Sequence, residues 1–239
     1  MKHLPNFLTS LNLASGFIAI IFAANGDLTT ASWVILVAMI FDFLDGFSAR
    51  ILKAYSDIGK ELDSLADLVS FGAAPGFIIY RLLSNAMPLP VAHSSGLEAI
   101  MLLVIISIPV IMPVCAAIRL ARFNIDPAQV TTFRGLPTPA NALAVISVVI
   151  AANYSDSSII KSFAGSLIGL DILTVILSIL MVSKLPFLSF KIPNFRIKGN
   201  EDRYLLALLV LISFTIFGIK AAPFVIPLYI IVSLISLLF

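Results

Sequence analysis

The chain has 239 residues, of which 60% are hydrophobic and only 12% are charged. Soluble globular proteins carry roughly 25% charged residues, so this composition predicts an integral membrane protein. A net charge of +2 without a long basic run argues against a nucleic-acid partner. The length predicts one membrane domain covering residues 1–239, without a separate soluble domain.

Apolar stretches of about 20 residues, the length that crosses a bilayer as a helix, recur along the chain. They predict an all-α integral membrane protein with about eight transmembrane helices. The expected ranges are about 5–24, 30–52, 59–83, 97–122, 159–183, 203–219 and 222–239, together with a fifth helix that follows Pro137 and Pro139 and ends near Asn153. The first stretch lacks a small-residue cleavage site, so we expect it to be retained as a helix. Within the single domain we expect a catalytic core at about 1–184 and an additional C-terminal helical pair at about 203–239.

The positive charges are distributed unevenly between the two sides of this arrangement. With the N-terminus inside, twelve of the fifteen Lys and Arg residues fall on the inner side. The three on the outer side are Arg81, Lys161 and Lys220. This positive-inside bias favours eight helices with both termini in the cytoplasm, and we expect a protein of the cytoplasmic (inner) membrane. A seven-span version would put the C-terminus outside but leave the first five helices unchanged. The inner segment 184–202 mixes apolar and basic residues and is expected to lie on the membrane surface.

The stretch from 40 to 76 holds six of the thirteen acidic residues. Asp42 and Asp45 are three positions apart, and Asp63 and Asp67 are four apart, so each pair shares one face of a helix. The short turn 54–58 predicts that the two helices are antiparallel neighbours. We therefore expect the four carboxylates to converge near the cytoplasmic membrane edge, where ionisable side chains within apolar segments indicate a functional site.

Four carboxylates at one site, without His or Cys nearby, favour hard divalent cations such as Mg²⁺ or Mn²⁺. Two such ions would balance the charge, and a two-metal site is typical of phosphoryl transfer. Gly46, Ala49 and Gly59 leave room for a ligand beside the carboxylates, and Arg50 offers a forked donor for phosphate. The alternative for each small residue is close packing between helices.

The same residues resemble the signature of the CDP-alcohol phosphatidyltransferase family, D-x2-D-G-x2-A-R-x8-G-x3-D-x3-D. All eight fixed positions are present over 26 residues: Asp42, Asp45, Gly46, Ala49, Arg50, Gly59, Asp63 and Asp67. The resemblance implies transfer of a phosphatidyl group from CDP-diacylglycerol to an alcohol, with release of CMP. It implies that Asp42, Asp45 and Asp63 bind metal and that Asp67 completes the metal site and acts as general base. Gly46, Ala49 and Arg50 would line the nucleotide and its phosphates. A homodimer whose site opens to the cytoplasm is also implied.

Other segments look like the phosphatidylserine synthase branch of that family, which implies L-serine as the acceptor. These segments are PNFLTSLNLASG (5–16), LDSLADLVSFGAAPG (62–76), RLARFN (119–124) and GLPTPA (135–140). The resemblance covers about residues 4–150.

Polar residues outside the signature are candidates for the two substrates. Arg119, Arg122, Asn124 and Arg134 lie near the inner membrane face and are candidates for binding the serine carboxylate or a phosphate. The alternative for the arginines is a role as interfacial anchors. Asn6 and Thr9, with Asn12 one turn on, are candidates for the nucleotide or for bonds between helices. Ser56 either contacts phosphate or caps the third helix.

Two other functions are compatible with parts of this pattern. The same reaction on a phosphorylated acceptor, such as glycerol phosphate or an inositol phosphate, would need additional cations in the pocket, which the inner arginines supply. A divalent-cation transporter would also carry acidic residues within the membrane. A carrier is expected to place them near the bilayer midplane on broken helices, whereas these aspartates lie toward one face.

Overall fold

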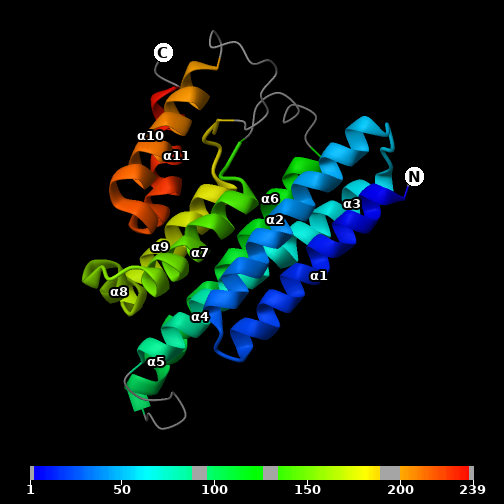
Figure 1. Ribbon diagram of the computed structural model, residues 1–239. Coiled ribbons are helices and arrows are strands. Elements are labelled where there is room, and N and C mark those ends of the chain that lie inside the picture. Colours follow the sequence, from blue (N-terminus) through cyan, green and yellow to red (C-terminus); the bar gives the residue numbers. More distant parts are fainter. Residues whose placement is uncertain (1–2, 88–95, 126–133, 189–199, 237–239) are drawn as a thin grey trace.

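The computed structural model describes residues 3–87, 96–125, 134–188 and 200–236, and this part of the chain is almost entirely helical (Figure 1). The helices are α1 (Leu4–Ala24), α2 (Leu28–Ile51), α3 (Asp57–Asp67), η1 (Leu68–Ala73), α4 (Ala74–Ala86), α5 (Gly96–Ser107), η3 (Ile108–Val110), α6 (Ile111–Ile125), α7 (Thr138–Tyr154), α8 (Ser158–Ala164), α9 (Leu167–Val182), α10 (Glu201–Phe217), η5 (Gly218–Phe224) and α11 (Val225–Ile235). No β-strand occurs in the described ranges, so the all-α prediction is confirmed.

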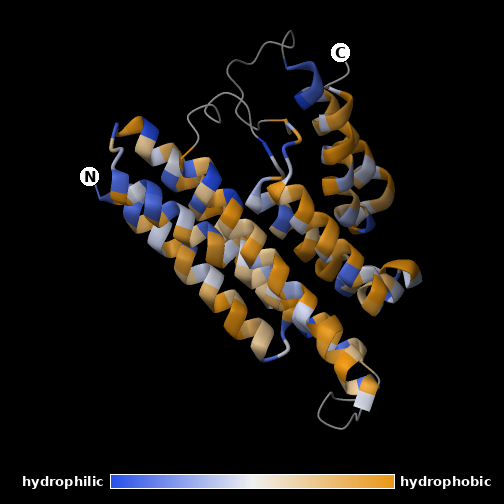
Figure 2. Ribbon diagram, turned by 180° about the vertical axis from the view of Figure 1, so that it is seen from behind, coloured by the Kyte–Doolittle hydropathy of each residue, from blue (hydrophilic) through white to orange (hydrophobic). Residues whose placement is uncertain are grey.

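Several helices are long and apolar enough to cross a membrane. Four helical segments meet that description, namely 4–24, 57–86, 96–125 and 201–235. The pair α8 and α9 adds a fifth if the bent pair is one span. Many large apolar residues of these helices are exposed, as expected for a surface that faces lipid. The ribbon coloured by hydropathy shows long hydrophobic stretches along the helices (Figure 2). The chain is therefore a multi-pass membrane protein by its helices, while the count of eight spans stays a prediction.

The expected helix at 159–183 is wrong as a single straight element. It is broken into α8 and α9, which are bent by 75°. Gly165 ends α8, and the Ser166 hydroxyl accepts a hydrogen bond from the Gly169 amide (3.1 Å), which starts a new helix. The glycine ends one helix and the serine after it caps the next, and this local signal outweighs the continuous hydrophobicity.

Two helices, α10 and α11, occupy the C-terminal range 201–235. Helices α10 and α11 pack against each other and are joined by the 3-10 segment η5 (Figure 1). Gly218 at its start has φ +57°, a left-handed conformation that favours glycine. The segment expected on the membrane surface, 184–202, lies mostly outside the described residues, since 189–199 are not described.

Helix α7 is the centre of the bundle. It packs against α2, α4, η1 and η5, and twelve of its residues are buried. Its side chains are mostly small, and small residues let neighbouring membrane helices approach closely, which suits this central position. Its first turn carries Thr138, which the bundle thereby holds next to the end of α3.

The chain leaves α3 through a π-helical segment, η1, at which two inter-helix hydrogen bonds hold the backbone. The Ser70 hydroxyl donates to the Asn12 carbonyl on α1 (2.9 Å), and the Asn141 amide on α7 donates to the Phe71 carbonyl (3.0 Å). Gly16 permits the close approach of α1, because a Cβ there would lie 2.6 Å from the Ser70 Cα. Segments of π-helix inside α-helices are frequent at functional sites, and this one directly follows Asp67.

Candidate active site

Three of the four predicted carboxylates meet between α2 and α3. Asp42, Asp63 and Asp67 each offer an oxygen that lies within 4.8 Å of the others. Asp45 is one turn further along α2 and accepts a 2.6 Å hydrogen bond from the Thr9 hydroxyl of α1. The structure thus brings Asp42, Asp63 and Asp67 into one cluster and places Asp45 beside it.

Helices α2 and α3 are neighbours, as predicted, since they bring Asp42 together with Asp63 and Asp67. Helix α1 packs along both of them, whereas direct packing between α2 and α3 is sparse within the described residues. A turn of five residues reverses the chain without closing the gap between the helices. The gap is useful, because it is where the main cavity of the site lies.

This cavity, which we call the aspartate cavity, has a volume of about 610 Å³. It is lined by Pro5, Asn6, Thr9, Asp42, Asp45, Gly46, Ala49, Arg50, Ala54, Tyr55, Ser56, Gly59, Lys60, Asp63 and Phe123. All seven residues predicted to bind nucleotide or phosphate are among them. Tyr55, Lys60 and Phe123 were not predicted, because one aromatic or lysine near a helix end carries no specific signal.

Two of the lining residues also have local structural roles. The Ser56 hydroxyl accepts a hydrogen bond from the Gly59 amide (3.0 Å), so Ser56 both caps α3 and lines the cavity. The Arg50 Nε donates to the Gly46 carbonyl one turn earlier (2.9 Å). That bond holds the stem of Arg50 against α2, and Arg50 lines the cavity.

Asp67 lies deeper than the aspartate cavity and is held from two sides. The Asn12 side-chain amide of α1 donates to its Oδ1 (3.4 Å), and the Thr138 hydroxyl of α7 donates to its Oδ2 (3.3 Å). Asn12 and Thr138 are both fully buried. The sequence offered no means of pairing Thr138 with Asp67, because 71 positions separate them.

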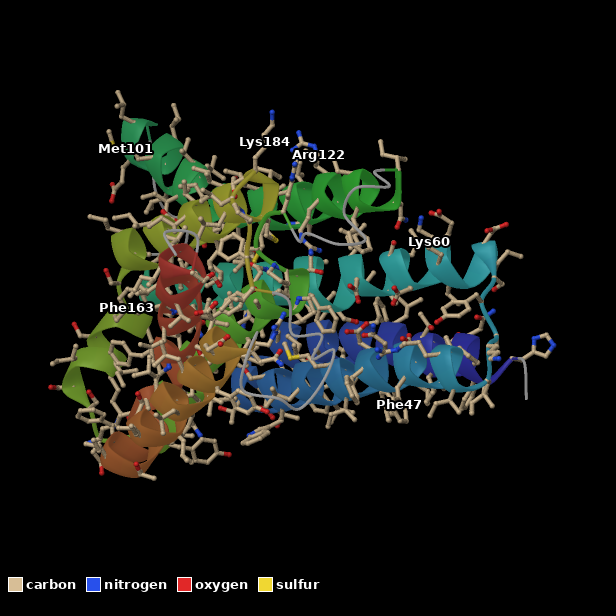
Figure 3. The ribbon with its side chains drawn as sticks, turned by 90° about the horizontal axis from the view of Figure 1, so that it is seen from above. Phe47, Lys60, Met101, Arg122, Phe163 and Lys184 are labelled. Carbon is tan, nitrogen blue, oxygen red and sulfur yellow. The ribbon has the colours of Figure 1, made fainter. Side chains whose placement is uncertain are left out.

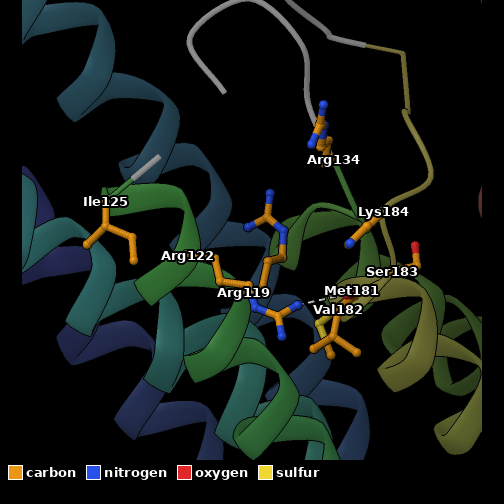
Figure 4. A pocket seen from close by; sticks show the side chains of 8 residues that line it. All are labelled: Arg119, Arg122, Ile125, Arg134, Met181, Val182, Ser183 and Lys184. Atoms are coloured by element: carbon orange, nitrogen blue, oxygen red, sulfur yellow. Dashed lines mark hydrogen bonds between the residues drawn. The ribbon is translucent and has the colours of Figure 1, made fainter. Parts of the chain in front are cut away.

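A second cavity, which we call the arginine cavity, opens on the other side of Thr138. It has a volume of about 250 Å³ and is lined by Arg119, Arg122, Ile125, Arg134, Met181, Val182, Ser183 and Lys184 (Figure 4). Arg122 donates to the Val182 carbonyl (3.1 Å), and Figure 3 shows Arg122 and Lys184 on the same side of the molecule. Three of the four predicted acceptor residues therefore share one cavity, to which Lys184 adds a fourth cation.

The fourth residue, Asn124, is elsewhere. Its side-chain amide donates to Ser64 Oγ (2.9 Å) and Glu61 Oε2 (3.4 Å), and its carbonyl accepts from Lys60 Nζ (2.7 Å). Asn124 braces the end of α6 against α3 instead of lining the arginine cavity. Two residues along a helix turn the side chain by about 200°, so Asn124 and Arg122 point to opposite sides.

The wall of the arginine cavity depends on a close backbone approach. The Gly135 amide donates to the Leu185 carbonyl (2.8 Å), and the Leu136 amide donates to the Leu180 carbonyl (2.9 Å). Gly135 has φ +80°, and a Cβ there would collide with the Met181 carbonyl oxygen. These contacts tie the segment before α7 to the end of α9 and position Arg134 at the cavity mouth (Figure 4).

The aspartate cluster is suited to cations. The three carboxylates repel one another at these distances, and Asp63 Oδ1 is buried without a hydrogen-bond partner. Among the described residues, no Lys or Arg forms an ion pair with them. An all-oxygen set with an unsatisfied buried oxygen matches the preference of Mg²⁺ or Mn²⁺. The residues present therefore fit a divalent-metal site.

Comparison with known proteins agrees with this arrangement. A family model described as CDP-alcohol phosphatidyltransferase matches residues 2–180. A CDP-diacylglycerol–serine O-phosphatidyltransferase from Helicobacter pylori (strain J99) is 30% identical over 240 residues, covering 98% of this chain and 91% of the relative. A protein of the same name from Bacillus subtilis (strain 168) is 34% identical over 191 residues, or 80% of this chain and 93% of the relative. An archaetidylserine synthase from Methanothermobacter thermautotrophicus is 34% identical over 158 residues, 65% of this chain and 61% of the relative.

The matched region contains the aspartate cluster, the whole lining of the aspartate cavity and four of the eight residues that line the arginine cavity. The chain belongs to the CDP-alcohol phosphatidyltransferase family.

Proposed function

We propose that this protein transfers the phosphatidyl group of CDP-diacylglycerol to the hydroxyl of L-serine, giving phosphatidylserine and CMP. The observation that carries the proposal is that Asp67 is linked to both cavities. It meets Asp42 and Asp63 of the aspartate cavity, and Thr138 connects it to Arg119 of the arginine cavity. One is lined by every signature residue except Asp67, and the other is lined by four cations. The names of the relatives from Helicobacter pylori and Bacillus subtilis support serine as the acceptor.

In this proposal the aspartate cavity takes the CDP group. Asn6, Thr9, Gly46, Ala49, Arg50, Ser56 and Gly59 would contact the nucleotide and its phosphates. The small residues leave space for the ligand, and the Arg50 guanidinium pairs with phosphate oxygens by charge-assisted hydrogen bonds. A volume of about 610 Å³ is in the range of small-molecule sites.

Asp42, Asp45, Asp63 and Asp67 would hold two divalent cations, Mg²⁺ or Mn²⁺. When bound, the ions offset negative charge on the pyrophosphate and on the departing CMP. Thr9 fixes one carboxylate of the set, because its hydroxyl donates to Asp45. The unpartnered Asp63 Oδ1 supports a role for that residue as a ligand.

Asp67 would act as the general base. A serine hydroxyl is a poor nucleophile at neutral pH, so a carboxylate must accept its proton as the oxygen attacks. The new bond joins the serine oxygen to the lipid-bearing phosphorus, and the bond from that phosphorus to the CMP oxygen breaks. The proton moves to Asp67, and CMP leaves with the bonding electrons. The links of Asp67 to both cavities support this role.

The arginine cavity would bind the acceptor. Arg119, Arg122 and Arg134 offer forked donors for a carboxylate. The four cations also favour one alternative, an acceptor that carries a phosphate, such as glycerol phosphate or an inositol phosphate. Asn124 is not part of this proposal, because it bonds to α3.

The proposal includes a topology. We propose eight spans, with both termini and the site on the cytoplasmic side of the inner membrane, a core at about 1–184 with a helical pair at 203–239, and a homodimer. Twelve of the fifteen basic residues support the orientation. The start of α1, the end of α6 and the start of α10 lie toward the same end of the bundle, opposite the end of α4 (Figure 1).

One assay tests the reaction. The purified protein in detergent micelles is mixed with CDP-diacylglycerol, Mn²⁺ and one acceptor, either serine, glycerol phosphate or inositol phosphate, and CMP is measured. We expect CMP release that depends on serine and on the metal. Release with a phosphorylated acceptor alone would favour the alternative, and release without any acceptor, or none at all, would contradict both.

A further inference from the structure

A continuous chain of hydrogen bonds connects the arginine cavity with Asp67. Arg119 lines that cavity, and its guanidinium donates to the Thr138 hydroxyl (3.4 Å). The same hydroxyl donates to Asp67 Oδ2 (3.3 Å). A hydroxyl has a single proton, so accepting from Arg119 leaves that proton for Asp67. Thr138 therefore links the Arg119 guanidinium with the Asp67 carboxylate.

The environment makes this link rigid. Thr138 is fully buried, and Arg119 is only 8% exposed. Pro137 precedes Thr138 with an extended backbone (ψ 141°), and Leu136 is bonded to the Leu180 carbonyl of α9. Thr138 is thus the first residue of α7, and the segment just before it is hydrogen-bonded to α9. A side chain in such a place has little freedom to change its hydrogen-bond partners.

Asn12 completes the support of Asp67 from the opposite direction. Its amide donates to Asp67 Oδ1, while its own backbone carbonyl accepts from Ser70 just beyond Asp67. The two carboxylate oxygens are therefore held by different helices, α1 and α7. Only Thr138 connects onward to the arginine cavity, since no bond from Asn12 to a residue of that cavity occurs among the described residues.

We infer that Thr138 is a positioning residue, which orients Asp67 toward the acceptor and joins it to Arg119. The inference rests on the proposed function, because it assumes that Asp67 receives a proton and that the arginine cavity holds the acceptor. Hydrogen-bond partners that orient a metal-binding or catalytic side chain typically contribute about 10- to 100-fold to affinity or activity. A methyl group in place of the Thr138 hydroxyl keeps the shape and removes both bonds.

The test compares Thr138→Val with Thr138→Ser in the CMP-release assay. We expect Thr138→Val to lower kcat by about 10- to 100-fold. The CDP-diacylglycerol concentration at half-saturation should stay within about twofold, since neither hydrogen bond of Thr138 reaches a residue of the aspartate cavity. Thr138→Ser keeps the hydroxyl and should recover most of the turnover.

Thr174→Val is the matched control. Thr174 is also a fully buried helical threonine, but its hydroxyl donates to the Leu170 carbonyl one turn earlier and touches neither cavity. We expect its kcat to equal that of the unmodified protein. A second measurement checks that Thr138→Val is folded. The variant should bind a CDP-diacylglycerol analogue in the presence of Mn²⁺, as measured by calorimetry.

Three results would overturn the inference: full turnover by Thr138→Val, equal impairment of Thr138→Ser, or a parallel loss of CDP-diacylglycerol binding. Failure of the proposed function has a different signature, because the unmodified protein would then release no CMP with serine. The two failures are therefore distinguishable in one experiment.

Discussion

The hydroxyl of Thr9 donates a 2.6 Å hydrogen bond to the carboxylate of Asp45, joining α1 to α2 at the edge of the aspartate cavity. Both side chains are buried, and the Thr9 hydroxyl is also near the Pro5 carbonyl (3.0 Å). Helix α1 therefore takes part in the site, although the acidic signature lies wholly on α2 and α3.

Replacing Thr9 by Val should weaken the metal-dependent binding of CDP-diacylglycerol. The substitution removes the only hydrogen bond from α1 to Asp45 among the described residues, so this carboxylate is no longer held in one orientation. We expect the Mn²⁺ concentration at half-maximal CMP release to rise by about 10-fold. Ser10→Ala is the control, since the exposed Ser10 hydroxyl bonds only to the Asn6 carbonyl. An unchanged Mn²⁺ titration for Thr9→Val would contradict the role assigned to this bond.

Replacing Gly46 by Ala should affect the ligand without affecting the fold. A Cβ at Gly46 meets no protein atom within 4 Å, yet Gly46 lines the aspartate cavity. We expect an unchanged or slightly higher unfolding temperature, because Ala favours a helix over Gly by about 1 kcal/mol. Half-saturation by CDP-diacylglycerol should need at least about fivefold more substrate, a loss of ~1 kcal/mol.

Gly165→Ala serves as the control for that variant. Its Cβ would make ordinary contacts of 3.6 and 3.8 Å with carbonyl oxygens at the end of α8, and it lines neither cavity. Normal CDP-diacylglycerol saturation of Gly46→Ala would show that no ligand approaches α2 at this position.

Replacing Gly16 by Ala should destabilise the protein. Its Cβ would overlap the Ser70 side chain and lie 2.6 Å from the Ser70 Cα, so α1 and η1 must move apart. Overpacking of this kind costs about 1–3 kcal/mol. The measurement is the unfolding temperature in one detergent, compared with Gly46→Ala. Equal temperatures for the two variants would mean that the α1–η1 contact is looser than described.

The membrane orientation has a direct chemical test. Cys115 is the only cysteine, so a Cys115→Ala background permits single labelling sites. Asn25 and Asp57 are exposed and lie beyond opposite ends of α2. In intact cells, a membrane-impermeant maleimide should label Asn25→Cys and leave Asp57→Cys unlabelled until the cells are broken. The reverse pattern would place the aspartate cavity on the outer side.

The sequence predicts the first four helices well, because hydrophobicity over about 20 residues is a local pattern. The expected ranges of the first four helices agree with α1, α2, the run 57–86 and the run 96–125. The α8–α9 break was missed, since hydrophobicity continues through Gly165 and Ser166. Here the capping residues Gly165 and Ser166 break a helix that the hydrophobic pattern of about twenty residues predicts to be continuous.

The sequence does not predict how Asp67 is held. Asn12 and Thr138 reach it from 55 and 71 positions away. Such pairings depend on how α1 and α7 cross the end of α3, and no local pattern encodes that. For the same reason the sequence does not link Lys184 with the three inner arginines, and it groups Asn124 with them as an acceptor residue. Tertiary packing places Lys184 in the arginine cavity and turns Asn124 toward Ser64.

The most direct test of the account follows both products of the reaction in the unmodified protein and in Asp67→Asn. With CDP-diacylglycerol, Mn²⁺ and isotopically labelled serine, the unmodified protein should form CMP and a serine-labelled lipid in equal amounts. Asp67→Asn keeps the shape of the side chain but cannot accept the proton, so it should lose at least about 100-fold in turnover. It should still bind CDP-diacylglycerol. Undiminished labelling of the lipid by Asp67→Asn, or CMP formed without labelled lipid by the unmodified protein, would contradict the account.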